Sequence, residues 1–139
     1  MSLEDGVSLN EISLKVSLER NNPYKCNIPY QEDHFYRAVD QKAYDDFIKN
    51  GEMIGEKHKS VYFQKGFANQ RYVAYGRIKP IIIETDSRAG FEIDEKSGYS
   101  KVETIKKSDV ENGKIPLRIW QHQGNNNWIP IYDNSKNLE

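Results

Sequence analysis

Hydrophobic residues recur along this chain with two different periods, and the two periods predict different elements. Residues 12–18 alternate apolar and polar side chains, which is typical of a half-buried strand. Residues 19–33 are polar and contain two prolines, so we expect a loop there. Residues 34–39 form a short apolar run that predicts the next strand.

The clearest helix signal follows that strand. Asp40 is a favourable N-cap, because its carboxylate can accept from the unpaired backbone N–H groups at a helix start. Apolar residues then recur at helical spacing: Ala43, Tyr44, Phe47 and Ile48. Gly51 supplies a left-handed stop. These signals predict a helix over residues 41–50.

The rest of the chain contains more strand signals than helix signals. Strands are expected at residues 61–63, 81–83, 101–105, 115–119 and 128–132, and a helix at about residues 67–75. The unbroken apolar run at 81–83 predicts a central strand that is buried on both faces. The turn residues at 124–127 predict that the last two strands pair as a hairpin. Early helices and late antiparallel pairing predict an α+β fold.

Composition narrows the possible classes of protein. At 139 residues, the chain suffices for one domain with its own core. The formal net charge of -1 gives no general attraction to nucleic acid or to an anionic membrane, and no apolar run is long enough to cross one. The lone Cys26 excludes an internal disulfide, and no His or Cys spacing predicts a metal site.

We expect three segments along the chain. Residues 1–33 are expected to form an N-terminal strand and a polar loop, with a cloning scar at residues 1–3. Residues 34–133 should form the core, and residues 134–139 a disordered tail.

Arg37 is the most informative residue for function, because arginine rarely lies within a short apolar run. Its chemistry fits two places: the wet face of an edge strand, or a cleft that receives an anionic ligand such as a phosphate. The run Tyr36–Asp40, the helix 41–50 and Gly51 together resemble the N-terminal motif of bacterial ADP-ribosyltransferase toxins of the Arg-Ser-Glu class. In that family the arginine anchors NAD. The resemblance implies two small antiparallel or mixed sheets that face each other across an NAD cleft, with two or three short helices.

The family's second site element is a central Ser-Thr-Ser strand followed by a helix. Residues 59–64 occupy that position, but the triplet is absent and only Ser60 remains. The resemblance implies that Tyr62 and Phe63 then supply an aromatic face for the cationic nicotinamide ring, with Tyr36 beside Arg37. Phe63 is equally typical of an ordinary core residue.

The third element is a late strand that carries a catalytic glutamate. Glu103 fits this element, because it shares a pleat face with Ile105 and precedes the Gly-Lys-Ile-Pro run at 113–116. Two other carboxylates are candidates for the same role: Glu92 and Glu95. By resemblance, the glutamate accepts a hydrogen bond from the ribose and stabilises the cation that forms as nicotinamide leaves. The family's usual Glu/Gln-x-Glu pair becomes Lys101-x-Glu103, so a preference for arginine as the acceptor is not evident.

The resemblance therefore implies an NAD-dependent mono-ADP-ribosyltransferase, the toxin module of a bacterial effector. Its substrate would be NAD, its acceptor a macromolecule, and an immunity protein would be a further partner. We expect a soluble domain that is secreted or delivered into a target cell as part of a larger protein, with no membrane partner.

Two other functions stay open. A histidine pair could provide the acid and base of a small metal-independent toxin ribonuclease, from among His34, His58 and His122. His34 is also an alternative NAD anchor, since another branch of the superfamily uses histidine in the first strand. The missing Ser-Thr-Ser favours a non-catalytic binding module with the same fold. Nucleic-acid binding has little support, because the basic residues are not gathered around the tyrosines.

Overall fold

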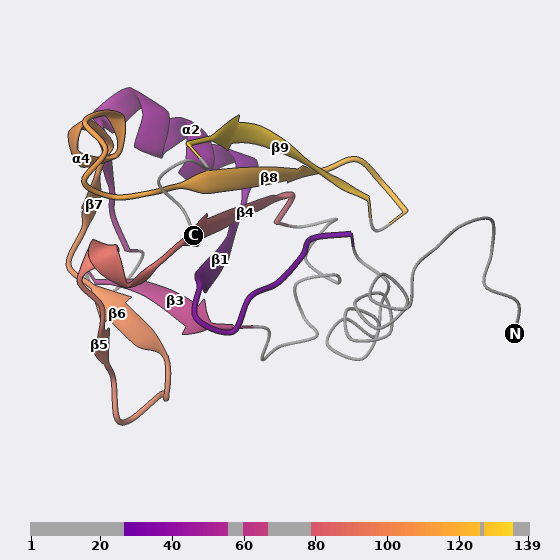
Figure 1. Cartoon of the computed structure of the whole chain (residues 1–139). Helices are drawn as coiled ribbons and strands as arrows, with labels where there is room; N and C mark the ends of the chain where they lie inside the picture. The colour runs from indigo at the N-terminus through magenta and orange to yellow at the C-terminus, as the bar shows by residue number, and fades with distance from the viewer. Residues whose placement is uncertain (1–26, 56–59, 67–78, 126, 135–139) are drawn as a thin grey trace, which may run out of the picture.

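The computed structural model describes residues 27–55, 60–66, 79–125 and 127–134 (Figure 1). They form a seven-stranded sheet in the order β5-β6-β3-β1-β4-β8-β9 and a two-stranded sheet, β2-β7. The strand pairings within the described residues are antiparallel, so the α+β class is confirmed. The strands are β1 (Phe35–Val39), β2 (Glu52–Met53), β3 (Val61–Lys65), β4 (Ile81–Thr85), β5 (Glu92–Ile93), β6 (Ser100–Val102), β7 (Ile105–Lys106), β8 (Arg118–His122) and β9 (Trp128–Asp133). The helices are α2 (Gln41–Asn50), α4 (Lys107–Glu111) and the short 3-10 helix η2 (Ser87–Ala89).

Helix α2 begins and ends where the sequence predicts. The Asp40 carboxylate accepts from the backbone N–H of Ala43 at 2.7 Å, which satisfies one of the unpaired donors at the helix start. Gly51 adopts a left-handed conformation with φ 76°, and its N–H donates to the carbonyl of Phe47. The side chain of Phe47 is buried, so this helix packs on the core through its apolar stripe.

Strand β4 is the central buried strand that the apolar run predicts. It lies between β1 and β8, and all five of its residues are buried. Side chains alternate along a strand, so Ile81 and Ile83 belong to one hydrophobic core and Ile82 belongs to another. The large sheet therefore has a core on each face.

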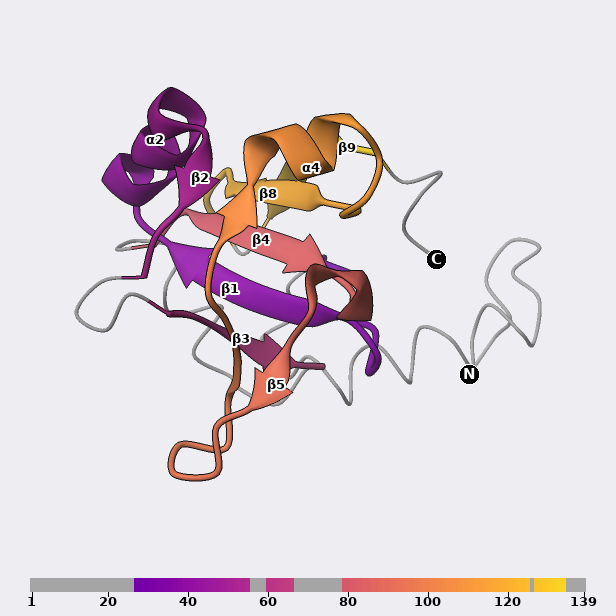
Figure 2. The same cartoon turned by 90° about the vertical axis from the view of Figure 1, so that its left-hand side faces the viewer.

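The first core lies between the large sheet and the elements that cover one of its faces. Figure 2 shows α2, β2 and α4 on this side of β1 and β4. Each covering element contributes a buried apolar residue to this core: Phe47 from α2, Met53 from β2, Ile105 from β7 and Val110 from α4. The resemblance implied two small sheets that face each other across a cleft. The structure has two sheets, but one of them is large, and the space between the sheets is not a cleft. The sheets have seven strands and two, because β3 pairs with β1, and apolar side chains fill the space between them.

The second core lies on the opposite face of the large sheet. Its buried residues are Ile28, Tyr30, Tyr36, Ala38, Ile82, Trp120 and Trp128. The segment that precedes β1 is held against this face by Asn27, whose side chain both donates to and accepts from the backbone of Trp128, at 2.8 and 2.6 Å. The described part of the loop expected before residue 34 therefore covers this face of the sheet.

Some predicted boundaries shift. The strand expected at 101–105 is divided into β6 and β7 by a bend at Glu103, and the strand expected from residue 115 begins at Arg118. The hairpin of β8 and β9 forms as predicted. Asn134, expected in the tail, hydrogen-bonds Leu117 through its backbone and its side chain. The strand at 12–18, the helix at 67–75, Cys26, His58 and residues 135–139 lie outside the described residues. Within the described part, no helix is long and apolar enough to cross a membrane.

Candidate functional site

Arg37 lines a pocket of about 320 Å³ beside helix α2, which we call the Arg37 pocket. Strand β1 lies inside the large sheet, between β3 and β4, so the edge-strand alternative for Arg37 does not hold. Arg37 is half-buried, and its Nη1 donates to the backbone carbonyl of Tyr62 in β3 at 3.0 Å. This contact fixes the direction of a cation at the pocket wall.

The wall of the Arg37 pocket combines an apolar floor with charged groups. The apolar part comes from Ala43, from Ile54 and from four buried residues of the first core: Val39, Phe47, Met53 and Ile83. The acidic residues on the wall are Asp40, Asp46 and Glu52, and the basic ones are Arg37 and Lys42. Half of the described lining residues are apolar and half are polar or charged, so the pocket suits a small ligand that has both an apolar part and polar groups.

Two of these charged side chains pair with each other on the exposed face of α2. Nζ of Lys42 lies 2.8 Å from Oδ2 of Asp46, one helical turn away. The hydrogen bond to Asp46 raises the pKa of Lys42 above its ordinary value. The ammonium group of Lys42 is therefore engaged at the pocket rim, and the cation deeper in the wall is Arg37.

The three elements that the resemblance requires are neighbours in the large sheet. Strand β6, which precedes Glu103, pairs with β3, and β3 pairs with the Arg37 strand β1. Val61 is opposite Val102, so continuing this register places Ser60 opposite Glu103. Segments far apart in the sequence thus come together side by side.

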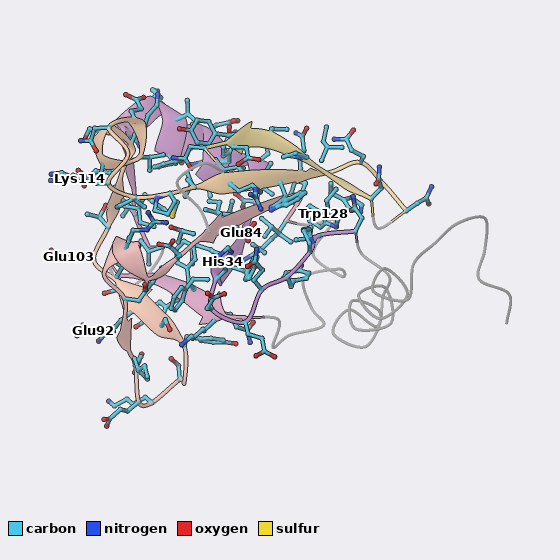
Figure 3. The ribbon with its side chains drawn as sticks, in the orientation of Figure 1. His34, Glu84, Glu92, Glu103, Lys114 and Trp128 are labelled. Atoms are coloured by element: carbon cyan, nitrogen blue, oxygen red, sulfur yellow. The ribbon has the colours of Figure 1, made fainter. Side chains whose placement is uncertain are left out.

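Glu103 itself does not line the Arg37 pocket. It is exposed, in the bend between β6 and β7, and Figure 3 shows it at the outer edge of the molecule, as it does Glu92. The next residue, Thr104, donates its hydroxyl to the carbonyl of Met53 at 2.8 Å, and Met53 is part of the pocket wall. Glu103 is therefore adjacent in sequence to Thr104, whose hydroxyl contacts a residue of the Arg37 pocket. Glu95 is exposed, in the turn between β5 and β6.

The two aromatic residues expected beside Arg37 do not line its pocket. Phe63 is 1% exposed and packs in the first core against Phe91, with ring centroids 5.0 Å apart. Tyr62 is its neighbour in β3, so its side chain points to the opposite face, and its backbone carbonyl accepts from Arg37. Phe63 is an ordinary core residue here, because Val61 and Phe63 share the face that α2 and the small sheet cover.

His34 and Tyr36 lie on the other face of β1 from Arg37, around a buried carboxyl group that sequence reasoning missed. Nδ1 of His34 lies 2.6 Å from Oε2 of Glu84, and the Tyr36 hydroxyl donates to the same oxygen at 2.9 Å. Trp120 Nε1 donates to Oε1 at 3.0 Å, and Arg118 Nη1 lies 3.5 Å from it. Figure 3 shows His34 and Glu84 close together in the interior.

The centre of this cluster is enclosed, which is typical of a structural role. His34, Tyr36 and Glu84 are each 0% exposed, so a substrate has no route to them. Burial, with the charge of Glu84 second, raises the pKa of Tyr36 far above its ordinary value, which keeps the hydroxyl protonated as a donor. His34 is therefore held as a partner of Glu84, away from the Arg37 pocket. The available signal was a glutamate that directly follows the apolar run at 81–83.

The described residues contain no group of three His, Cys, Asp or Glu side chains that could hold a metal ion. Comparison of the chain with protein-family models, with curated proteins and with solved structures finds no match. The candidate site is thus the Arg37 pocket together with the neighbouring end of β6.

Proposed function

We propose that this protein is an NAD-dependent mono-ADP-ribosyltransferase, the toxin module of a bacterial effector, with an ADP-ribosyltransferase-like arrangement of its strands. The observation that carries the proposal is the strand order β6-β3-β1. In this order the Arg37 strand β1 neighbours β3, which begins directly after Ser60, and β3 neighbours β6, which ends directly before Glu103. The Arg37 pocket next to them supports the proposal, because it offers a fixed cation for a phosphate.

In the proposed reaction, Arg37 binds a phosphate oxygen of NAD in the pocket. The bond between the ribose C1′ and the nicotinamide nitrogen breaks, and its electron pair leaves with nicotinamide. Glu103 stabilises the cation that forms at C1′, and a nucleophile of the acceptor then bonds to C1′ and releases its proton to solvent. Because Glu103 is exposed, a macromolecular acceptor can approach it.

Incubation with labelled NAD and a bacterial lysate tests this function. The expected result is label on a protein or nucleic acid and release of nicotinamide. Absence of both, with wild-type protein that is folded, would contradict the proposal. Breakdown of RNA without NAD would instead indicate the ribonuclease alternative.

A further inference from the structure

Glu52 is a carboxylate of the Arg37 pocket that no pattern in the sequence singles out. It opens β2 directly after the Gly51 stop of α2, and it is half-buried in the pocket wall. Within the described part of the chain, no hydrogen bond or ion pair engages its side chain. Its carboxylate oxygens are not among the buried polar atoms that lack a partner in the described residues, so they stay open to the pocket and can accept hydrogen bonds from a ligand.

The other carboxylates of the pocket are already engaged. Asp40 caps α2 by accepting from the N–H of Ala43, and Asp46 pairs with Lys42. Glu52 is therefore the pocket carboxylate, among the described residues, that is left for a ligand. Arg37, held by the Tyr62 carbonyl, places a positive charge on the same wall. One wall thus offers an acceptor for hydroxyl groups and a cation for a phosphate.

The size of the pocket limits what these groups can bind. A volume of about 320 Å³ is near the lower end of the roughly 300–1,000 Å³ range of ligand pockets. Its apolar floor, which includes Phe47 and Met53, suits one flat ring rather than two. A whole dinucleotide carries two rings, two riboses and two phosphates, so only half of it fits this space.

We infer that the Arg37 pocket binds one ribonucleoside 5′-monophosphate unit, either free or as one half of NAD, and that Glu52 accepts hydrogen bonds from its ribose hydroxyls. Arg37 contacts the phosphate, and Phe47 and Met53 contact the ring. The inference rests on the ligand site in the proposed function, but not on the transfer reaction. It makes Glu52 the residue that distinguishes ribose from 2′-deoxyribose.

Calorimetric titration of the full chain with AMP, 2′-deoxy-AMP and NAD tests this inference. Wild-type protein should bind AMP and NAD, and should bind 2′-deoxy-AMP roughly 10- to 100-fold more weakly, the equivalent of one hydrogen bond to a charged group. Glu52→Gln should lose most of this preference. The matched control is Glu111→Gln, since Glu111 is exposed on α4 and is outside the pocket, and it should keep the preference. If Glu52→Gln fails to fold, Glu52→Asp decides, because it keeps the charge but shortens its reach.

The outcomes separate this inference from the proposed function. Equal affinity of the wild type for AMP and 2′-deoxy-AMP, or a preference that both Glu52 variants retain in full, would overturn the inference. If NAD is consumed while AMP shows no binding, the inference fails and the transferase function stands. If AMP and NAD bind with the ribose preference but no label leaves NAD, the inference stands and the proposed function fails.

Discussion

Replacement of Glu84 by glutamine should lower the free energy of unfolding, because it removes the centre of the buried cluster. Each oxygen of Glu84 contacts two groups: His34 Nδ1 and the Tyr36 hydroxyl at Oε2, and Trp120 Nε1 and Arg118 Nη1 at Oε1. An amide keeps one oxygen and presents an NH₂ group in place of the other. One pair of groups therefore loses its acceptor, whichever way the amide turns.

The magnitude follows from the number of groups affected. A buried donor without an acceptor costs about 1–3 kcal/mol, so two such groups at Oε2 would give about 2–6 kcal/mol, whereas at Oε1 Arg118 keeps its contact with Asp133 and Trp120 is the group that loses its acceptor. The Tyr36 hydroxyl can turn to accept from the new NH₂ group, which lowers the upper end of this energy range. Loss of one partner in a buried ion pair costs about 3–5 kcal/mol. We therefore expect a loss of about 2–4 kcal/mol for Glu84→Gln.

Urea unfolding followed by tryptophan fluorescence measures this loss. The chain has two tryptophans, Trp120 and Trp128, and both are buried, so their emission reports on the second core. Glu111→Gln is the control and should change stability by less than about 0.5 kcal/mol, as is usual for exposed positions. A loss for Glu84→Gln that equals the control would refute the claim that the cluster stabilises the fold.

Three further predictions concern single contacts. Asp40→Ala should lower the free energy of unfolding by about 1 kcal/mol, because the N–H of Ala43 loses its acceptor. An unchanged midpoint of urea unfolding would mean that this cap does not stabilise the protein. Burial raises the pKa of Asp86, but the hydrogen bonds from Arg88 outweigh this and lower it, so the pair stabilises the fold above pH 3.8, the ordinary pKa, and this stability is lost as the pH falls. Arg88→Gln should thus be less stable than wild type at pH 7 and equally stable in acid, and a pH-independent difference in thermal unfolding would disprove this linkage. Arg37→Lys keeps the charge but loses the planar fork, so NAD affinity by calorimetry should fall by about 1–3 kcal/mol, and equal affinity would count against Arg37 as the anchor.

The parts of the fold that follow from local signals could be predicted from the sequence. Helix α2 is bounded by Asp40 and Gly51, which act within one turn of the chain, and both ends are confirmed. The apolar run at 81–83 likewise identified the strand that is buried on both faces. The sheet order could not be predicted, because the pairings of β1 with β3 and of β3 with β6 depend on contacts between distant segments.

The candidate site was predictable in part for the same reason. Arg37 stands out because a charged residue in an apolar run is a local anomaly, and its pocket is visible only once α2 and β2 are in place. Glu52 lies in a two-residue strand that has no periodicity to identify it. The role of Glu84 depends on the registers of β1 and β8 against β4, which bring Tyr36 and Trp120 to its oxygens.

Release of nicotinamide from labelled NAD, measured for wild type and Glu103→Gln with a bacterial lysate as the source of acceptor, tests the proposed transfer reaction and the role of Glu103 in it. If Glu103 stabilises the developing cation, the variant should keep its fold and its NAD affinity but turn over NAD about 100- to 1,000-fold more slowly. Glu92→Gln and Glu95→Gln, changed in the same way, should stay active, and loss of activity in one of these alone would move the catalytic role to that residue. Equal rates of nicotinamide release in the wild type and all three variants, or no release by the wild type, would contradict the proposed function.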